Sequence, residues 1–151
     1  MKIFSKSETK AVFIILLVVF VISFFNFRVA LRRGRDNERE NDLGDIAKML
    51  NDYKDKNSIY PPALSALPVS PKDPGTPNGY SYLYITDGKF FQIYASLEGI
   101  KDEAEYNPKI ASLNLKCGKF ICNFGKSSGS VPLDKSLEEY ENELIQNAKN
   151  K

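Results

Sequence analysis

The residues best suited to chemistry in this chain are carboxylates gathered between positions 98 and 105. Glu98, Asp102 and Glu103 lie close together, and Glu105 follows them. Carboxylate oxygens, helped by backbone carbonyls, are the ligands that Ca²⁺ prefers. The spacing does not match an EF-hand loop, so a solvated acidic loop explains the cluster equally well. Calcium is therefore the one cofactor that the sequence suggests.

Histidine is absent from the chain, and there are two cysteines. Without an imidazole there is no Ser-His-Asp triad, Cys-His dyad or His-ligated zinc site. No phosphate-binding loop or dinucleotide fingerprint is present either. Cys117 and Cys122 leave no cysteine over, which favours one disulfide in an oxidising compartment over two unrelated buried thiols. We expect a protein that is not an enzyme.

One feature dominates the sequence, an apolar run at residues 11–27. The elements that position the carboxylates and cysteines come after it in the chain. Its first fifteen residues, 11–25, contain one polar side chain, Ser23. A membrane-spanning helix needs about 20 apolar residues, and extending the run to Leu31 reaches that length if Arg28 snorkels to the headgroups. The run therefore predicts a transmembrane helix.

Two other interpretations of the apolar run are weaker. Lys2, Lys6 and Lys10 would suit the basic start of a secretory signal, but no small-x-small cleavage site follows. A buried core helix would need apolar partners on all sides, and the remaining chain is too polar to supply them. We expect residues 1–35 to form a tail and an uncleaved span, with lipid-facing or assembly residues Phe13, Leu16, Val19, Phe20 and Phe24.

Charge is distributed unevenly along the chain. Residues 1–35 hold seven Lys/Arg and one Glu, a net charge of +6, whereas residues 36–151 have a net charge of −4. The basic part therefore suits a lipid bilayer with anionic headgroups, and the acidic part gives no support to nucleic-acid binding. The arginines after the run would place the following domain in the cytoplasm by the positive-inside rule, but the cysteine pair favours an extracytoplasmic domain.

Helical spacing continues beyond the apolar run. Leu43, Ile46, Leu50 and Tyr53 recur on one face, with charged residues on the others. This pattern predicts one helix reaching about residue 56, apolar all round in its first half and amphipathic in its second. Two helices hinged near Gly34 are the alternative.

The remainder, residues 57–130, has loop and β character. A Pro-rich loop at 68–79 precedes two aromatic and β-branched runs, 80–86 and 90–95, joined by Asp87-Gly88, which predicts a hairpin. Alternation places Leu83 and Ile85 opposite Tyr82 and Tyr84. The aromatic residues could form a stacking platform for nucleic acid or sugar, but packing against the helix explains them as well.

After the hairpin we expect a mostly polar loop over residues 96–116, a third strand at 119–124 and a turn at 125–129. Residues 131–151 contain a last helix with Leu137, Tyr140, Leu144 and Ala148 at helical spacing. The predicted fold class is α+β. A long N-terminal helix packs on a small antiparallel sheet, the extracytoplasmic domain covers residues 36–151, and its amphipathic helix covers 36–56.

Several stretches follow one another in an order that resembles a known family. They are residues 34–43 (GRDNERENDL), 49–53 (MLNDY), 58–61 (SIYP), 72–74 (KDP), 82–84 (YLY), 91–98 (FQIYASLE) and 122–129 (CNFGKSSG). Together with the apolar N-terminal helix, they resemble the type IV pilins and type II secretion pseudopilins. No single stretch is specific to that family, but their order and spacing are.

This resemblance implies a membrane-stored structural subunit that assembles with other pilin or pseudopilin subunits and with membrane assembly machinery. The long helix would pack inside a fibre, and the head, braced by its disulfide, would cover the outside. In major pseudopilins Ca²⁺ sits in the loop after the hairpin, which corresponds here to residues 98–105, although the spacing does not match closely.

The N-terminal helix departs from the family pattern. Family members carry a Gly or Ala before the cleavage point and a Glu at the fifth mature position. Here Ala11 is the only small residue placed to precede a cut, and the fifth position after it is Leu16. The family's subunit role therefore has two alternatives, a fibre-tip initiator or a permanent single-pass membrane protein whose head is a binding module.

Overall fold

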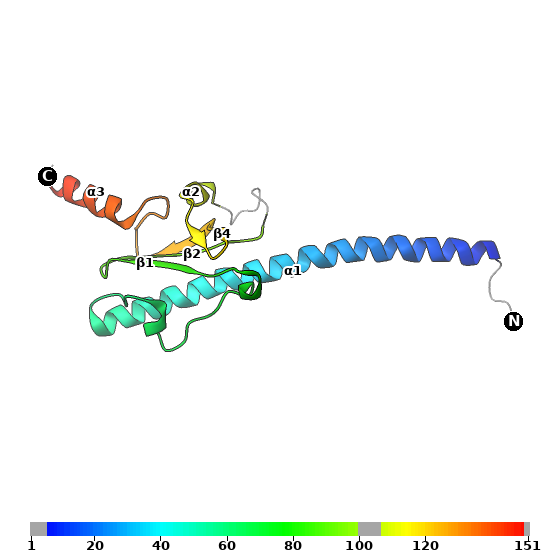
Figure 1. The fold of residues 1–151 in the computed structure, drawn as a ribbon, viewed down its shortest axis with the longest axis horizontal. Coiled ribbons are helices and arrows are strands. Elements are labelled where there is room, and N and C mark those ends of the chain that lie inside the picture. The colour runs from blue at the N-terminus through cyan, green and yellow to red at the C-terminus, as the bar shows by residue number, and fades with distance from the viewer. Residues whose placement is uncertain (1–5, 100–106, 150–151) are drawn as a thin grey trace. The chain divides into compact units, whose positions relative to one another are not determined.

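The computed structural model describes residues 6–99 and 107–149 of the chain. The predicted α+β class is confirmed: the described residues form a long N-terminal helix, a small antiparallel sheet and a C-terminal helix (Figure 1). The backbone divides into two compact units, Met1–Gly34 and Arg35–Lys151. We call the first the N-terminal unit and the second the head.

The long helix α1 runs from Lys6 to Asn57 and contributes residues to both units. Gly34 lies inside this helix, so the alternative of two separate helices is not observed. The helix ends where Ser58 takes a left-handed backbone conformation, with a φ of 65°. Lys54 and Lys56 lie in its last turn, where positive charge is favourable because the helix dipole is negative there.

The main sheet has three antiparallel strands in the order β1-β2-β5. Strand β1 (Leu83–Thr86) and strand β2 (Phe91–Ala95) form the predicted hairpin. The Asp87 carboxylate closes its turn by accepting hydrogen bonds from the backbone N–H groups of Lys89 and Phe90. Gly88 takes a positive φ in that turn, as the Asp-Gly pair predicts.

The sheet separates two hydrophobic cores. On one face Phe91, Ile93 and Ala95 pack with Leu43, Ile46 and Leu50 of α1, and Tyr82 and Tyr84 pack at the margin of this first core. On the other face lies the second core, Tyr94, Ile110, Cys117 and Cys122, with Leu83 and Ile85 beside it. The predicted alternation along β1 is therefore confirmed, and its aromatic residues serve packing.

The prediction of a third strand at residues 119–124 is wrong. Strand β4 (Phe120–Ile121) pairs with β3 (Lys116–Cys117) in a separate two-stranded sheet. The third strand of the main sheet is β5 (Phe124–Ser127), which pairs with β2 and takes in part of the predicted turn. Gly125 suits this strand because a Cβ there would lie 2.8 Å from the carbonyl oxygen of Ile93.

Short elements complete the head. Of two 3₁₀ turns, η1 (Leu64–Ala66) precedes the Pro-rich loop and η2 (Thr76–Asn78) lies within it. Helix α2 (Pro108–Ser112) was not predicted, although Asn107 caps it and Pro108 begins it, a recognisable start signal. The predicted C-terminal helix is α3 (Leu137–Lys149), and the Ser136 hydroxyl accepts a hydrogen bond from Glu139 N.

Candidate functional site

The apolar half of α1 is the largest exposed hydrophobic surface among the described residues. Every side chain from residue 7 to residue 31 is exposed, with exposed fractions of 67% for Phe13 and 68% for Phe20. By length and composition, α1 is the one described helix that could cross a membrane. A contiguous apolar surface of this size requires a cover of lipid or protein.

The structure divides the residues predicted for the membrane and assembly helix into two groups. Phe13, Leu16, Val19, Phe20 and Phe24 are exposed on the N-terminal unit. In contrast, the side chains of Leu43, Ile46 and Leu50 are fully buried in the first core, and Tyr53 packs against it. The three buried residues therefore attach the sheet to α1, whereas Tyr53 is only partly buried.

Basic and aromatic side chains mark the end of the apolar run. The Arg28 guanidinium lies 5.1 Å from the centre of the Phe24 ring, a cation–π contact. Arg33 is exposed one turn further on. Guanidinium and aromatic groups at this place suit the headgroup region of a bilayer.

A buried ion cluster lies inside the head. The Arg39 side chain is fully buried, and its Nε and Nη2 donate to the two carboxylate oxygens of Asp73 at 3.0 and 3.1 Å. Its Nη1 donates to Asp36 Oδ1 at 2.7 Å and to Glu98 Oε1 at 3.0 Å. Arg35 pairs with the same Glu98 through its Nε at 2.8 Å. We call these five residues the Arg39 cluster.

Three segments of the head contribute to the Arg39 cluster. Asp36 and Arg39 come from adjacent turns of α1, Asp73 from the Pro-rich loop and Glu98 from the segment after β2. The backbone takes part as well, since Glu98 N donates to Asp36 Oδ1 and Gly75 N donates to Asp73 Oδ1. The cluster therefore ties the helix to two loops that local sequence does not connect.

The electrostatics of the cluster favour a structural role. Burial alone would lower the pKa of Arg39, but its hydrogen bonds to Asp73, Glu98 and Asp36 outweigh burial and raise that pKa above its usual range. The Arg35 guanidinium holds the pKa of the Glu98 carboxyl below its usual range, against the effect of burial and with help from Arg39. Arg39 therefore stays positive and Glu98 negative near neutral pH, which favours their ion pair.

The predicted calcium ligands are only partly described. The Glu98 carboxylate accepts hydrogen bonds from Arg35 and Arg39, and Asp102 and Glu103 lie outside the described residues. In residues 6–99 and 107–149, no group of three or more His, Cys, Asp or Glu side chains is arranged to hold a metal ion. The described part of the predicted site thus holds guanidinium groups beside Glu98.

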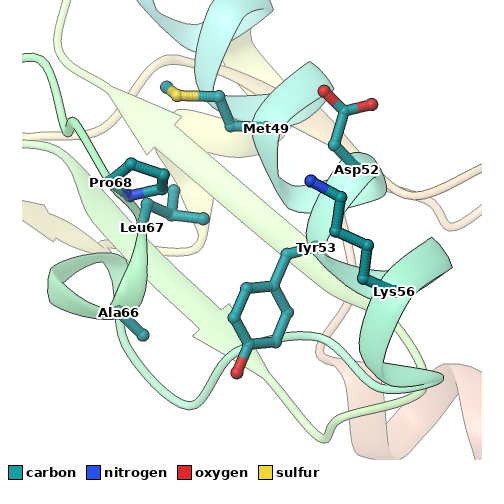
Figure 2. A pocket seen from close by; sticks show the side chains of 7 residues that line it. All are labelled: Met49, Asp52, Tyr53, Lys56, Ala66, Leu67 and Pro68. Atoms are coloured by element: carbon teal, nitrogen blue, oxygen red, sulfur yellow. The ribbon is translucent and has the colours of Figure 1, made fainter.

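A shallow groove of about 360 Å³ lies on the head beside the last turns of α1. Figure 2 shows its lining side chains, which come from α1 on one side and from residues 66–68 on the other. Most of the lining is apolar, with one acidic and one basic side chain: Met49, Asp52, Tyr53, Lys56, Ala66, Leu67 and Pro68.

The predicted disulfide is confirmed. Cys117 and Cys122 are bonded and fully buried in the second core, and their Cα atoms are 5.2 Å apart. Asp36, Arg39 and Asp73 were not predicted as site residues from the sequence. Their only local signal is the i, i+3 spacing of Asp36 and Arg39, which indicates a helix pair but not burial or a third partner.

Comparison with known proteins gives no match: no protein-family model, no curated protein and no solved structure is similar to this chain.

Proposed function

We propose that this protein is a membrane-anchored, pilin-like structural subunit of a type II secretion pseudopilus or type IV pilus, which assembles through its long N-terminal helix. The observation that carries this proposal is the difference in burial between the two halves of α1. Its N-terminal half is apolar and exposed on all sides, while one face of its C-terminal half is buried against a small sheet.

The physical basis of assembly would be the replacement of lipid by neighbouring copies of the chain around the apolar half of α1. In the bilayer, lipid covers the apolar half of α1, and the helix satisfies its own backbone hydrogen bonds. In a fibre, neighbouring copies would cover the same surface. Once the surface leaves lipid, each Å² kept from water is worth about 25 cal/mol, so a helix without neighbours would be strongly disfavoured.

The disulfide supports an extracytoplasmic head, because such bonds form and persist in oxidising compartments. The partners of this function would be the lipid bilayer, other pilin or pseudopilin subunits and membrane assembly machinery. No feature of the acidic head supports nucleic-acid binding.

A second candidate function is a non-polymerising single-pass membrane protein whose head binds a partner. The specific observation in its favour is Leu16, an exposed apolar residue at the position where polymerising family members carry Glu. In that case the apolar half of α1 would remain in lipid permanently.

A cysteine scan of residues 16–22 tests both candidates. The two native cysteines are joined in a disulfide, so each introduced cysteine is the sole free thiol. Seven consecutive positions cover every face of a helix, because one turn takes about 3.6 residues. After treatment with a membrane-permeant oxidant, a fibre subunit should give cross-linked species with helical periodicity in a sheared extracellular fraction.

The matched control is Ser130→Cys, an exposed position on the head. Two results together would contradict the fibre proposal and favour the binding module. The protein would be found only in the membrane fraction, and cross-linking would show no helical periodicity across the seven positions.

A further inference from the structure

The disulfide lies in a very short hairpin, residues 116–122. Its strands, β3 and β4, contain two residues each. An isolated two-stranded hairpin is at best marginally stable in water, even when its strands are longer. The Cys117–Cys122 bond therefore gives this hairpin a covalent support, inside the second core, that its four strand residues cannot supply. We call residues 116–122 the disulfide hairpin.

The turn of the disulfide hairpin contacts the end of the Pro-rich loop. Lys119 N donates to the Gly79 carbonyl at 2.9 Å, and Gly118 forms an isolated antiparallel bridge with Tyr80. The approach is so close that a Cβ on Gly118 would lie 2.1 Å from Gly79 O. Gly118 also has a positive φ of 74°, so only glycine fits both constraints.

A stack of side chains leads from this contact to the Arg39 cluster. The Phe120 ring lies parallel to the Tyr80 ring, with 3.8 Å between their centres. The Arg39 guanidinium lies 4.4 Å from the centre of the same Tyr80 ring. Since Phe120 already covers one face of Tyr80, Arg39 occupies the opposite face. Tyr80 is therefore held between the disulfide hairpin and the buried guanidinium.

The stack matters because Tyr80 helps to keep water from Arg39. A buried ion cluster is favourable only while its geometry is tight and its remaining groups are satisfied. Gly75 shows how tight this geometry is, since a Cβ there would lie 2.7 Å from both Arg39 Nη2 and Tyr80 Cδ2. If Tyr80 moved away, water could reach Arg39 and replace its contacts with Asp73.

We propose that the Cys117–Cys122 bond is a redox-sensitive clamp on the Arg39 cluster. With the bond intact, Phe120 holds Tyr80 on Arg39, and Arg39 orders the loop that carries Asp73. When the bond is reduced, the disulfide hairpin opens, Tyr80 leaves Arg39 and this loop loosens, while the first core remains packed. The clamp lies in the head alone and would operate whether or not the chain forms a fibre.

The redox step requires a dithiol as co-reactant. Both sulfurs are buried, so the disulfide hairpin must first open locally. One thiolate of the dithiol then attacks one cysteine sulfur, which breaks the Cys117–Cys122 bond and forms a mixed disulfide. The second thiolate then displaces the remaining protein sulfur. Two electrons and two protons pass to the protein, which ends with two thiols, and the dithiol ends as a disulfide. Oxidation of the head is the reverse reaction.

Amide hydrogen exchange of the full chain in detergent micelles tests the clamp. The oxidised protein is compared with protein reduced by dithiothreitol and with the Cys117→Ser/Cys122→Ser variant. The reporters are the amides of Gly75, Thr76 and Tyr80, which all donate hydrogen bonds within the loop. Their exchange should be faster by about tenfold or more without the disulfide, while β2 amides stay within about twofold.

Two variants that keep the disulfide separate the stack from the bond. Phe120→Leu removes the ring that holds Tyr80 and should speed exchange at Gly75, Thr76 and Tyr80 by a smaller factor. Phe90→Leu is the matched control, because Phe90 pairs with Tyr140 at 5.5 Å and takes no part in the stack. Phe90→Leu should leave the exchange rates of the three amides unchanged.

Three outcomes would overturn the proposal. The first is unchanged exchange at the three amides after reduction. The second is equal loss of protection in the loop and in β2, which would make the disulfide a support of the whole head. The third is an equal effect of Phe120→Leu and Phe90→Leu on the loop.

Discussion

Arg39 illustrates how much one side chain can carry when it is buried with its counter-charges. The side chains of Arg39 and Asp73 are both fully inaccessible to solvent, and Asp36 is nearly so. Replacing Arg39 by Met keeps much of the volume but leaves two buried carboxylates without their cation. We expect Arg39→Met to lower the free energy of unfolding of the head by about 3–5 kcal/mol.

Denaturant unfolding followed by near-UV circular dichroism would measure this loss. The matched control is Lys72→Met, next to Asp73 in the same loop but exposed, which should change the free energy by no more than about 0.5 kcal/mol. Similar effects of the two substitutions would mean that the Arg39 cluster contributes little.

The ion pairs of Glu98 lead us to expect that the stability of the head depends on pH. The pKa of Glu98 is lowered in the folded protein, first by the hydrogen bond from Arg35 and also by Arg39, against burial. A carboxyl with a depressed folded pKa stabilises the fold above the pKa of the unfolded chain, about 4.3 for Glu. That stability is lost as the pH falls from about 5 through the lower folded pKa.

We therefore expect the denaturant concentration at the unfolding midpoint of the head to decrease as the pH falls below about 5. Arg35→Gln should reduce the contribution of Glu98 to this decrease, because the largest cause of the lowered pKa is removed. A midpoint profile identical in the two proteins would show that the Arg35–Glu98 pair does not contribute.

The burial of individual residues could be predicted from the sequence where it depends only on helical or strand periodicity. The buried stripe Leu43, Ile46 and Leu50 follows from helical spacing, and the two faces of β1 follow from alternation. The Arg39 cluster could not be predicted, because two partners of Arg39 are 34 and 59 residues away in the chain and come from two loops. Local charge patterns do not reveal which carboxylate meets which guanidinium.

At the scale of elements, two glycines of the head predict opposite outcomes on substitution by alanine. Gly44 lies inside α1, and a Cβ there would meet only the flexible end of Lys126, at 3.3 Å. Gly44→Ala should stabilise the helix by up to about 1 kcal/mol. Gly75→Ala would place a Cβ against Arg39 and Tyr80 and should cost about 1–3 kcal/mol.

Thermal unfolding of both variants in the same detergent would compare them directly, with the unmodified protein as reference. A decrease in the melting temperature of Gly44→Ala would indicate that Lys126 cannot move aside. An increase for Gly75→Ala would contradict the tight packing of the Arg39 cluster.

Elements with a strong local sequence signal were predicted correctly, and elements with a weak local signal were not. The helix over the apolar run, the hairpin around Asp87-Gly88 and the C-terminal helix were all predicted. Strand β5 was not, because it contains Gly125 and lies in a stretch with the composition of a turn. Its strand conformation depends on pairing with β2, a tertiary contact that overrides local preference.

For the whole molecule, the main expectation concerns the side of the membrane on which the head lies. The disulfide favours the extracytoplasmic side, whereas the arginines that follow the apolar run favour the opposite orientation. Ser7 and Ser130 are exposed serines at the start of α1 and on the head. Their single-cysteine variants provide a matched pair of reporters.

A membrane-impermeant maleimide applied to intact cells should label Ser130→Cys and leave Ser7→Cys unlabelled until the cells are lysed. The reverse pattern would place the head in the cytoplasm and contradict the proposed function. Labelling of the unmodified protein without reduction would show that Cys117 and Cys122 are not bonded in cells.

The side-by-side packing of Phe120, Tyr80 and Arg39 also has a consequence for how this protein can change over evolutionary time. Three distant segments share one stack, and Gly75 and Gly118 leave room for it. A lineage that loses the cysteine pair also loses a selective reason to keep an aromatic residue at 120, whereas Arg39 is still required by Asp36 and Asp73. We expect positions 117, 120 and 122 to be inherited, and lost, as a group.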